Sequence, residues 1–420
     1  PSQGGDIAPD YMSVFPGASA IHFTDLMDVN VRFETIARFF TSSKTDGMVG
    51  VHNVLEDQSI NRQSFMTSMD ADGIYYNSQQ DVLYQLDRTN NVVVAYSDVL
   101  DSLEAGAEPL QTATSTSDFS NGREIAVFGD KLVVAQDASD ANNQINKLVV
   151  YDVSPTSITY SKEHEVDFNL WGIHLEANNL YAIMDNTSDL AIIPNFLNLP
   201  DGDIMATRII HIEDMVRTHG LTYVQDGDRM FLTDVGEAGS PTDGAFVVVN
   251  GFSAKAQNDT ISRDEQIRVE GDTTLLGNPV DIAYFESFDK VFIAERANGG
   301  GRILGFDIPD ATTSIPPFYN AMESGASAIY MEVQGDGAVT PIVDIFDPNF
   351  TDDILISARM SGGNEVPAVT NDAIGVATVT FNDDYTEATI NATVSNLSSA
   401  FVGSHIHSGF PGENGNVVFD

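Results

Sequence analysis

Short apolar stretches separated by polar turns fill the chain between residues 70 and 310. Five segments share one layout: an apolar strand, a polar turn, a second strand ending near an acid, a Gly- or Asn-rich turn and a third strand. Alternating apolar positions, β-branched residues and turn residues are signals of strands and hairpins, so an all-β fold is predicted. The segments are residues 73–96, 124–153, 172–193, 220–250 and 281–308.

The layout recurs about every fifty residues. Equivalent apolar residues in the first strands lie 51, 48, 48 and 61 residues apart, at Ile74, Ile125, Ile173, Leu221 and Ile282. The pentapeptide GASAI, at 17–21 and again at 325–329, adds Ile21 and Ile329 to this series. Antiparallel units of this length that cannot bury both faces alone stack around an axis in a β-propeller. The seven anchors predict seven blades, with six as the alternative.

The order "GI…LY…D…N…V" within these segments resembles the NHL and YWTD-type propeller families. The resemblance covers residues 17–345 and concerns architecture, not activity. Residues 30–70 fit the blade pattern poorly, and "IEDMVRTHG" (212–220) reads as a helical insertion. Residues 1–16, "PSQGGDIAPDYMSVFP", form an extended leader ahead of the first blade.

A different pattern begins after a linker at 346–353. Its elements are "SGGNEVPAV" (361–369), "GVATVTF" (375–381), "ATINATVSNLSSAFVGSHIH" (388–407) and "PGENGNVV" (411–418). In this order they resemble the CHRD domain, the module named after chordin. Alternation in the strands independently predicts a small antiparallel β-sandwich over 354–420. Since the family's domain normally runs further, the sandwich is expected to lack its last strands here.

The charge and composition of the chain exclude some classes of binding partner. The chain carries 62 acidic and 19 basic residues, a net charge of −43, which excludes nucleic acid and anionic membranes as partners. It has no cysteine and no apolar run long enough to span a bilayer. A secreted, extracellular or cell-surface protein is expected. Five sequons that glycosylation could use begin at Asn186, Asn258, Asn349, Asn391 and Asn396.

His405 and His407 form the first candidate metal site. Two histidines one residue apart point to the same face of a strand, and Glu413 in the following loop could supply a third ligand. The remaining histidines all lie in the propeller region, however, so a structural role in the tight turn is favoured over a transition-metal site.

Acidic loops form the second set of candidates. Three short acidic turns could supply the hard oxygen ligands of Ca²⁺, namely those of Asp70 and Asp72, Asp201 and Asp203, and Asp226 and Asp228. None has EF-hand spacing. A recurrent acid near the end of the second strand is expected to accept backbone N–H bonds from the following turn, at Asp87, Asp137, Asp185, Asp234 and Glu295.

Function is predicted partly by exclusion. The sequence has no nucleophile elbow, Walker loop, HExxH motif or dinucleotide fingerprint. The favoured hypothesis is a secreted, non-catalytic structural or adhesive protein of a microbial surface or matrix, with no catalytic residues assigned. The alternatives are a calcium-dependent, lactonase-like propeller hydrolase and a module that binds a carbohydrate or protein ligand.

Head-to-tail self-association is also expected. A sandwich that lacks a strand exposes unpaired backbone groups along an edge, which a strand from a second molecule can cover. The leader 1–16 is the candidate donor, and a contact of this kind that does not close into a ring propagates as a fibre.

Overall fold

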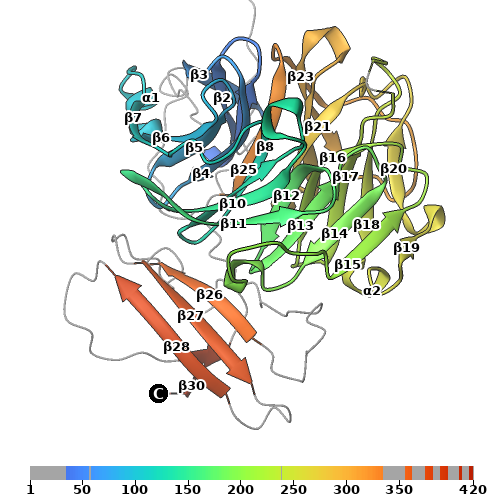
Figure 1. Ribbon diagram of the computed structural model, residues 1–420. Coiled ribbons are helices and arrows are strands. Elements are labelled where there is room, and N and C mark those ends of the chain that lie inside the picture. Colours follow the sequence, from blue (N-terminus) through green and yellow to red (C-terminus); the bar gives the residue numbers. More distant parts are fainter. Residues whose placement is uncertain are drawn as a thin grey trace, which may run out of the picture.

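The propeller has six blades. The computed structural model describes residues 35–55, 58–237 and 239–332 with their side chains, the backbone of Val333, and from 355 to 419 the backbone of five strands. Within 35–333, six sheets of four or five strands are arranged around a common axis (Figure 1), and all their strands pair antiparallel except the last two of the five-stranded sheet. The all-β propeller is therefore confirmed, with the alternative count of six in place of seven.

Each blade begins at the channel. The inner strands are β25 (Ala326–Val333) in blade 1, β4 (Ala71–Asn77) in blade 2, β8 (Gly122–Phe128) in blade 3, β12 (Leu170–Glu176) in blade 4, β16 (Thr218–Val224) in blade 5 and β21 (Pro279–Phe285) in blade 6. The second strands, in the same order, are β1 (Thr35–Ser43), β5 (Val82–Asp87), β9 (Lys131–Gln136), β13 (Asn179–Met184), β17 (Arg229–Asp234) and β22 (Lys290–Glu295).

Two further rings of strands complete the blades. The third strands are β2 (Met48–Leu55), β6 (Val92–Ser97), β10 (Asn146–Ser154), β14 (Asp189–Ile193), β18 (Ala245–Asn250) and β23 (Arg302–Asp307). The outer strands are β3 (Ile60–Met66), β7 (Leu110–Thr114), β11 (Ser157–Val166), β15 (Arg208–Ile212) followed by β19 (Thr260–Ile261), β20 (Ile267–Glu270) and β24 (Tyr319–Met322).

Helices are short and lie between strands. They are α1 (Val99–Glu104) and α2 (Phe252–Lys255), with 3-10 turns at Asp140–Asn142, Phe196–Asn198, Arg263–Glu265, Glu286–Phe288 and Asn298–Gly300. The helical insertion expected at 212–220 is wrong, because β15 ends at Ile212 and β16 begins at Thr218. No helix in the described part of the chain has the length and apolar character needed to cross a membrane.

The blade count differs because the ring closes with a strand from the far end of the propeller segment. β25 pairs antiparallel with β1, from Ala37 opposite Val333 to Ser43 opposite Ala326. The anchor Ile329 is thus the inner strand of the blade whose other strands come from 35–66, and is not part of a blade of its own. Residues 35–66, which fit the pattern poorly, supply three strands of that blade.

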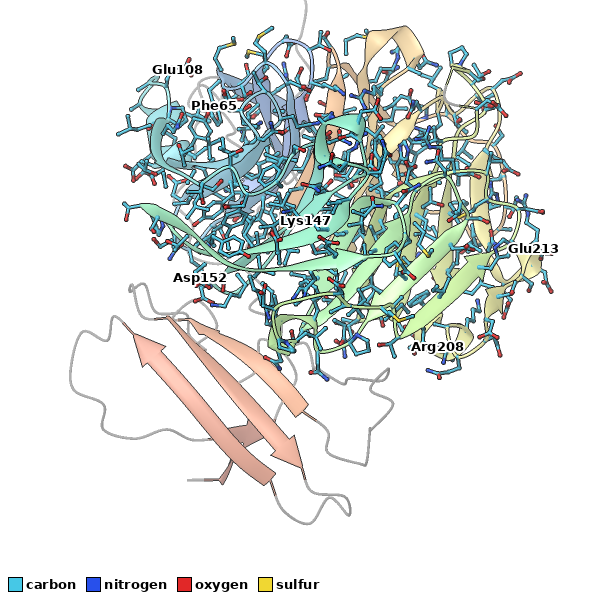
Figure 2. All side chains as sticks on the ribbon, in the orientation of Figure 1. Phe65, Glu108, Lys147, Asp152, Arg208 and Glu213 are labelled. Atoms are coloured by element: carbon cyan, nitrogen blue, oxygen red, sulfur yellow. The ribbon has the colours of Figure 1, made fainter. Side chains whose placement is uncertain are left out.

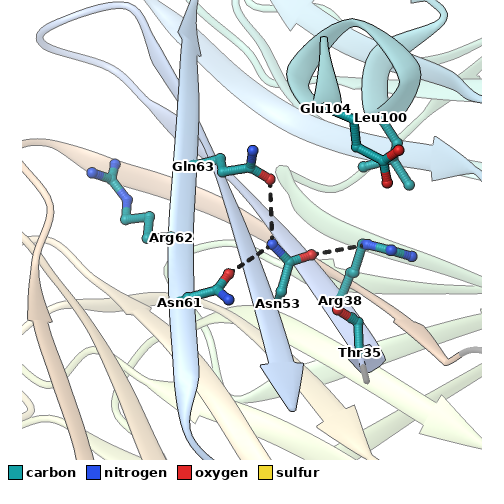
Figure 3. A pocket seen from close by; sticks show the side chains of 8 residues that line it. All are labelled: Thr35, Arg38, Asn53, Asn61, Arg62, Gln63, Leu100 and Glu104. Carbon is teal, nitrogen blue, oxygen red and sulfur yellow. Dashed lines mark hydrogen bonds between the residues drawn. The ribbon is translucent and has the colours of Figure 1, made fainter. Parts of the chain in front are cut away.

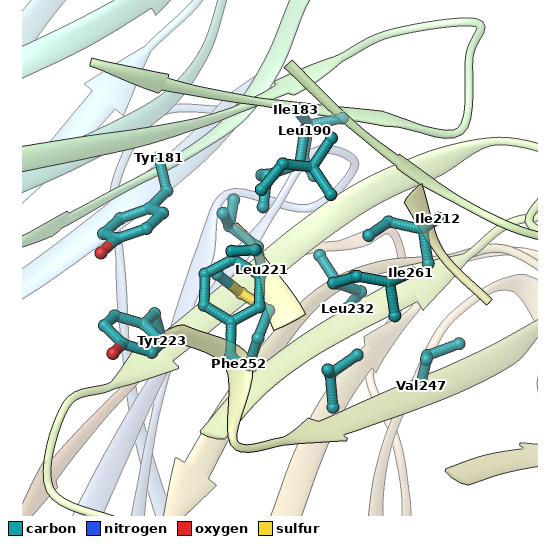
Figure 4. Close-up of a cluster of buried hydrophobic side chains, with 14 of the residues drawn as sticks. Tyr181, Ile183, Leu190, Ile212, Leu221, Tyr223, Leu232, Val247, Phe252 and Ile261 are labelled. Carbon is teal, nitrogen blue, oxygen red and sulfur yellow. The ribbon is translucent and has the colours of Figure 1, made fainter. Parts of the chain in front are cut away.

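Apolar side chains fill the space between adjacent blades. Between blades 4 and 5, for example, Tyr181 and Leu190 pack with Leu221, Tyr223 and Phe252 (Figure 4). Because each sheet is covered on both faces, strands such as β18 are apolar at nearly every position, a pattern typical of fully buried strands.

The C-terminal strands form two further sheets. β26 (Leu355–Ser361), β27 (Ile374–Phe381) and β28 (Ala388–Ser395) are antiparallel, and β29 (Ile406–Ser408) pairs with β30 (Asn416–Phe419). Their antiparallel pairing is as the alternation predicts. The leader 1–16 and the linker 346–353 lie outside the described residues.

Candidate functional site: the crown of the channel

One backbone hydrogen bond recurs in every blade at the end of the channel where the inner strands begin. The residue after the second strand donates its N–H to the carbonyl of the residue before the inner strand. The pairs are Lys44–Gly325, Arg88–Asp70, Asp137–Asn121, Asp185–Asn169, Val235–Arg217 and Arg296–Asn278, at N···O distances of 2.7–3.2 Å. We call these twelve residues the crown.

A register shift at the start of each inner strand follows the crown. Each shift leaves one residue or two out of the regular pairing. The extra residues are Ser327, Asp72, Arg123, Trp171, His219 and Val280 in blades 1 to 6. Bulges bend a strand and change the direction of a side chain, so these residues have unlike surroundings: Val280 packs into the apolar core, whereas Asp72 pairs with Arg88 of the crown.

Three of these side chains stack across neighbouring blades. The Trp171 and His219 rings are parallel, with centroids 3.8 Å apart, and the Arg123 guanidinium lies 4.0 Å from the Trp171 ring. His219 Nε2 is 3.5 Å from the Asp185 carboxylate. Burial lowers the pKa of His219 to about 4, so its imidazole is neutral at physiological pH. The stack therefore joins the inner strands of blades 3 to 5 through their side chains.

Two ion-paired acids of the crown and the two cations that have no direct partner among the described residues lie on different sides. Asp137 and Asp185 lie in blades 3 and 4, and each is paired with an arginine, Arg123 at 2.9 Å and Arg217 at 3.0 Å. The opposite side, formed by blades 6, 1 and 2, carries three basic residues instead: Arg296, Lys44 and Arg88, in that order. Three cations are thus neighbours on one half of the crown, whereas the arginines of the other half are paired with Asp137 and Asp185.

Only one of these three cations has a direct partner. Arg88 Nη1 lies 3.2 Å from the Asp72 carboxylate and 3.8 Å from that of Asp70. Its Nη2 donates to the Asn121 side chain. By contrast, the side chains of Lys44 and Arg296 make no hydrogen bond or ion pair within the described part of the chain.

The pKa values of the charged side chains on this side of the crown reflect their burial and their closeness to one another. Burial, with Arg88 and Arg296 nearby, lowers the pKa of Lys44 to about 8. Burial also lowers the pKa of Arg296, to which Arg88 and Arg123 contribute. Asp72 is almost fully buried, which raises its pKa in spite of Arg88 and Arg296. Two cations with little counter-charge therefore lie beside one buried carboxylate.

Two more carboxylates lie one residue further along the inner strands. Asp281 accepts the backbone N–H of Ile282 at 2.8 Å and that of Ile329 at 2.7 Å, so it joins blade 6 to the closing strand. Glu124 accepts the N–H of Ile125. Burial raises the pKa of both, that of Asp281 to about 7. Both carboxyl groups therefore act as acceptors for backbone N–H groups of the inner strands.

We expect the stability of the propeller to depend on pH through Asp281. Its pKa is about 7 when folded and near 3.8 when unfolded, so its contribution is fully present below pH 4 and is lost as the pH rises to 7. The loss is on the order of 4 kcal/mol. Urea unfolding at pH 4 to 8 should show the difference in stability between wild type and Asp281→Asn shrinking or reversing over this range. A constant difference would contradict the prediction.

Four of the five recurrent acids accept backbone N–H groups of the following turn, as predicted. Glu295 is fully buried and accepts the N–H groups of Gly277, Asn278, Ala297 and Asn298. Asp234 accepts those of Val216, Arg217 and Gly236, and Asp87 that of Asn90. Asp185 accepts the N–H of Asn186 and also pairs with Arg217. Asp137 departs from the prediction, because its carboxylate accepts from the Arg123 and Asn121 side chains instead.

The candidate calcium loops do not come together. Asp72 is paired with Arg88, Asp201 accepts the N–H of Glu163, and Asp228 accepts bonds from Tyr223 and Ser253. Asp203 and Asp226 are both exposed. Nowhere among the described residues do three His, Asp or Glu side chains meet in a metal-binding arrangement.

Other predicted residues lie near or beyond the limits of the description. His405 and Glu413 are outside the described residues, and His407 lies on β29. Asn349 and Asn396 are also outside, and Asn391 lies on β28. Asn186 and Asn258 are exposed, although the Asn186 side chain donates to Asp185. The zinc or copper site and the use of the sequons stay predictions.

A pocket of about 400 Å³ is the other candidate site (Figure 3). It lies between blade 1 and α1 and is lined by polar side chains. Asn53 accepts from Arg38 Nε at 2.9 Å and donates to Asn61 at 2.9 Å and Gln63 at 3.4 Å. Because the side-chain amides of Asn53, Asn61 and Gln63 bond to one another, these residues mainly stabilise blade 1.

The basic side of the crown was missed in the sequence. Lys44, Arg88 and Arg296 each follow a second strand directly, in "TSSK", "QLDR" and "IAER". An alignment of these three strand ends would have placed the cations at equivalent positions. Residues 35–66 were not recognised as a blade, so Lys44 could not be aligned.

Comparisons with known proteins agree with this architecture. Residues 356–420 match the CHRD domain family. One chain of the nidogen/laminin complex matches with a TM-score of 0.50 and 12% identity, over 71% of this chain and 98% of that chain. A periplasmic gluconolactonase from Pseudomonas aeruginosa matches with a TM-score of 0.49 and 10% identity, over 71% and 99% of the respective chains. No curated protein matches the chain. The chain thus combines a six-bladed β-propeller with a segment that matches the CHRD domain family, the organisation that the sequence motifs predict.

Proposed function

We propose that the chain is a secreted, non-catalytic structural or adhesive protein of a microbial surface or matrix, and that its propeller holds a partner at the crown. The observation that carries the proposal is the pair of cations, Lys44 and Arg296, that have no direct partner among the described side chains. In a chain of net charge −43, unneutralised positive charge at the mouth of a channel favours binding of an anionic group.

Several features support binding over catalysis. The carboxylates of the channel, Asp281 and Glu124, accept backbone N–H groups, and His219 is stacked on Trp171. A hydrolase would need a nucleophile or an activated water beside a free base. A CHRD domain is consistent with secretion, and a propeller of this fold forms part of the nidogen/laminin complex, an analogy of fold alone.

The test of the proposed function is sedimentation of the full chain with an insoluble extracellular matrix, together with an assay for lactone hydrolysis with and without Ca²⁺. We expect the wild type to co-sediment, at least tenfold less of the double variant Lys44→Met/Arg296→Gln to do so, and hydrolysis to stay at the rate of buffer. Calcium-dependent turnover would instead establish the hydrolase alternative.

Calcium is proposed as a stabilising ligand of the acidic surface. Crowded carboxylates repel one another, so a cation that binds only the folded state raises its stability. We expect a chelator to lower the melting temperature measurably in low salt, with added Ca²⁺ restoring it. An unchanged melt in chelator at both low and high salt would remove the proposal.

Self-association through the leader is the third part of the proposal. β26 and β28 each pair with a single described strand, so the CHRD sheet has two edges at which another strand could add. We expect the wild type to form fibres visible by electron microscopy and a chain lacking residues 1–16 to stay monomeric. Fibres that persist after the deletion would exclude the leader as donor.

A further inference from the structure

The charge of the crown sets the kind of ligand it can take. Five basic side chains lie there or one residue along the inner strands: Lys44, Arg88, Arg123, Arg217 and Arg296. Four carboxylates face them, those of Asp70, Asp72, Asp137 and Asp185. Among these nine groups the positive charges outnumber the negative by one, and the cations without a direct partner in the described part of the molecule are Lys44 and Arg296. The nearby carboxyls of Asp281 and Glu124 have raised pKa values, which favours their neutral forms.

The position of this excess charge is fixed by the ring. Lys44 and Arg296 occupy equivalent places in adjacent blades 1 and 6, each held by the backbone bond that recurs in the crown. Arg88 is held beyond them in blade 2, where its Nε is buried without a partner. The backbone bonds hold the main chain at Lys44 and Arg296, and the Arg296 charge contributes to lowering the pKa of Lys44, so the two side chains lie near one another.

We propose that the crown binds a carboxylate group of the partner, held between the Lys44 ammonium and the Arg296 guanidinium beside Asp72. A single negative charge neutralises the excess, whereas a doubly charged sulfate or phosphate would overcompensate it next to the buried Asp72 carboxylate. Arginine matches a carboxylate with two parallel N–H bonds, and lysine adds a third donor. This inference rests on the proposed function only in taking the crown as the face that holds the partner.

Binding should also be linked to pH through Lys44. The charged groups that face Lys44 are Arg88, Arg296, Asp70 and Asp72. The free lysine has a pKa of about 8, and a bound anion favours its charged form. Affinity should therefore be constant below pH 7.5 and fall as the pH rises above 8, approaching tenfold per pH unit.

The experiment is calorimetric titration of the full chain with glucuronate and with acetate, using glucose and sulfate as comparison probes. We expect both carboxylates to bind more tightly than sulfate and glucose not to bind. Lys44→Met and Arg296→Gln should each weaken glucuronate binding at least tenfold, about the contribution of one charged hydrogen bond. The control is Arg208→Gln, the same loss of charge on outer strand β15 (Figure 2), which should leave affinity unchanged.

A second variant separates charge from folding. Lys44→Arg keeps the positive charge but does not titrate near pH 8, so it should bind glucuronate with no fall in affinity up to pH 9.5. Sulfate binding as tightly as glucuronate, or an equal loss in the Arg208 variant, would overturn the proposal. Glucuronate binding without matrix binding would refute the proposed function alone, and matrix binding unaffected by 100 mM glucuronate would refute this inference alone.

Discussion

Gly220→Ala is expected to destabilise the propeller by about 3 kcal/mol or more, the upper range for overpacking of a closely packed site. A Cβ at Gly220 would lie 2.4 Å from the Cα of Asp281 on the neighbouring inner strand. The nearest atoms all belong to the backbone of Asp281 and Ile282. Because the ring of blades is closed on itself, neither inner strand can move away without shifting the next blade. Urea unfolding followed by circular dichroism should show a clearly lower midpoint.

The matched control for this change is Gly239→Ala. A Cβ at Gly239 would meet nothing within 4 Å, and the residue is exposed. Its unfolding midpoint should equal that of the wild type within error. Equal midpoints for all three proteins would mean that the inner strands do not approach one another as closely as the structure has them.

Glu295→Ala is expected to lower the free energy of unfolding by about 4 kcal/mol or more. The change leaves four backbone N–H groups of two turns without their acceptor, and each N–H that stays buried and unsatisfied costs about 1–3 kcal/mol. Those donors are at Gly277, Asn278, Ala297 and Asn298. The affected turns support Arg296, so the variant should also lose affinity for anions at the crown. Thermal unfolding and calorimetric titration measure the two effects.

Glu108→Ala is the control for the loss of a carboxylate. Glu108 is exposed and accepts one long bond, at 3.3 Å, from the N–H of Met66 (Figure 2). Its replacement should change stability by no more than about 0.5 kcal/mol, as is usual for surface positions. A comparable loss in both variants would point to a general effect of removing acidic charge and not to the turn bonds of Glu295.

The sequence predicted the blades wherever their strands are buried on both faces. Apolar runs such as "RMFLTD" and "AFVVVN", with acids at the strand ends, determine strands and hairpins locally. Closure of the ring is not local: β25 joins β1 across nearly 300 residues, and nothing in the period marks Ile329 as the partner of Thr41. The sequence therefore could not decide between six and seven blades.

The crown was beyond the reach of the sequence for a related reason. Its basic side is formed by Arg296, Lys44 and Arg88 of blades 6, 1 and 2. These blades are neighbours only after the ring has closed. The carboxylates that did stand out, such as Asp234 and Glu295, serve turns. What distinguishes Lys44 and Arg296 is that their side chains have no direct partner in the described molecule, a property of the assembled ring and not of any motif.

A crystal structure of the full chain grown with 10 mM glucuronate would test the carboxylate site at the crown most directly. We expect the carboxylate of the ligand to lie within hydrogen-bonding distance of the Lys44 ammonium and the Arg296 guanidinium, with the Arg88–Asp72 pair retained beneath it. A crown that holds only water, or glucuronate bound elsewhere on the propeller, would contradict the proposal that these two cations hold the partner.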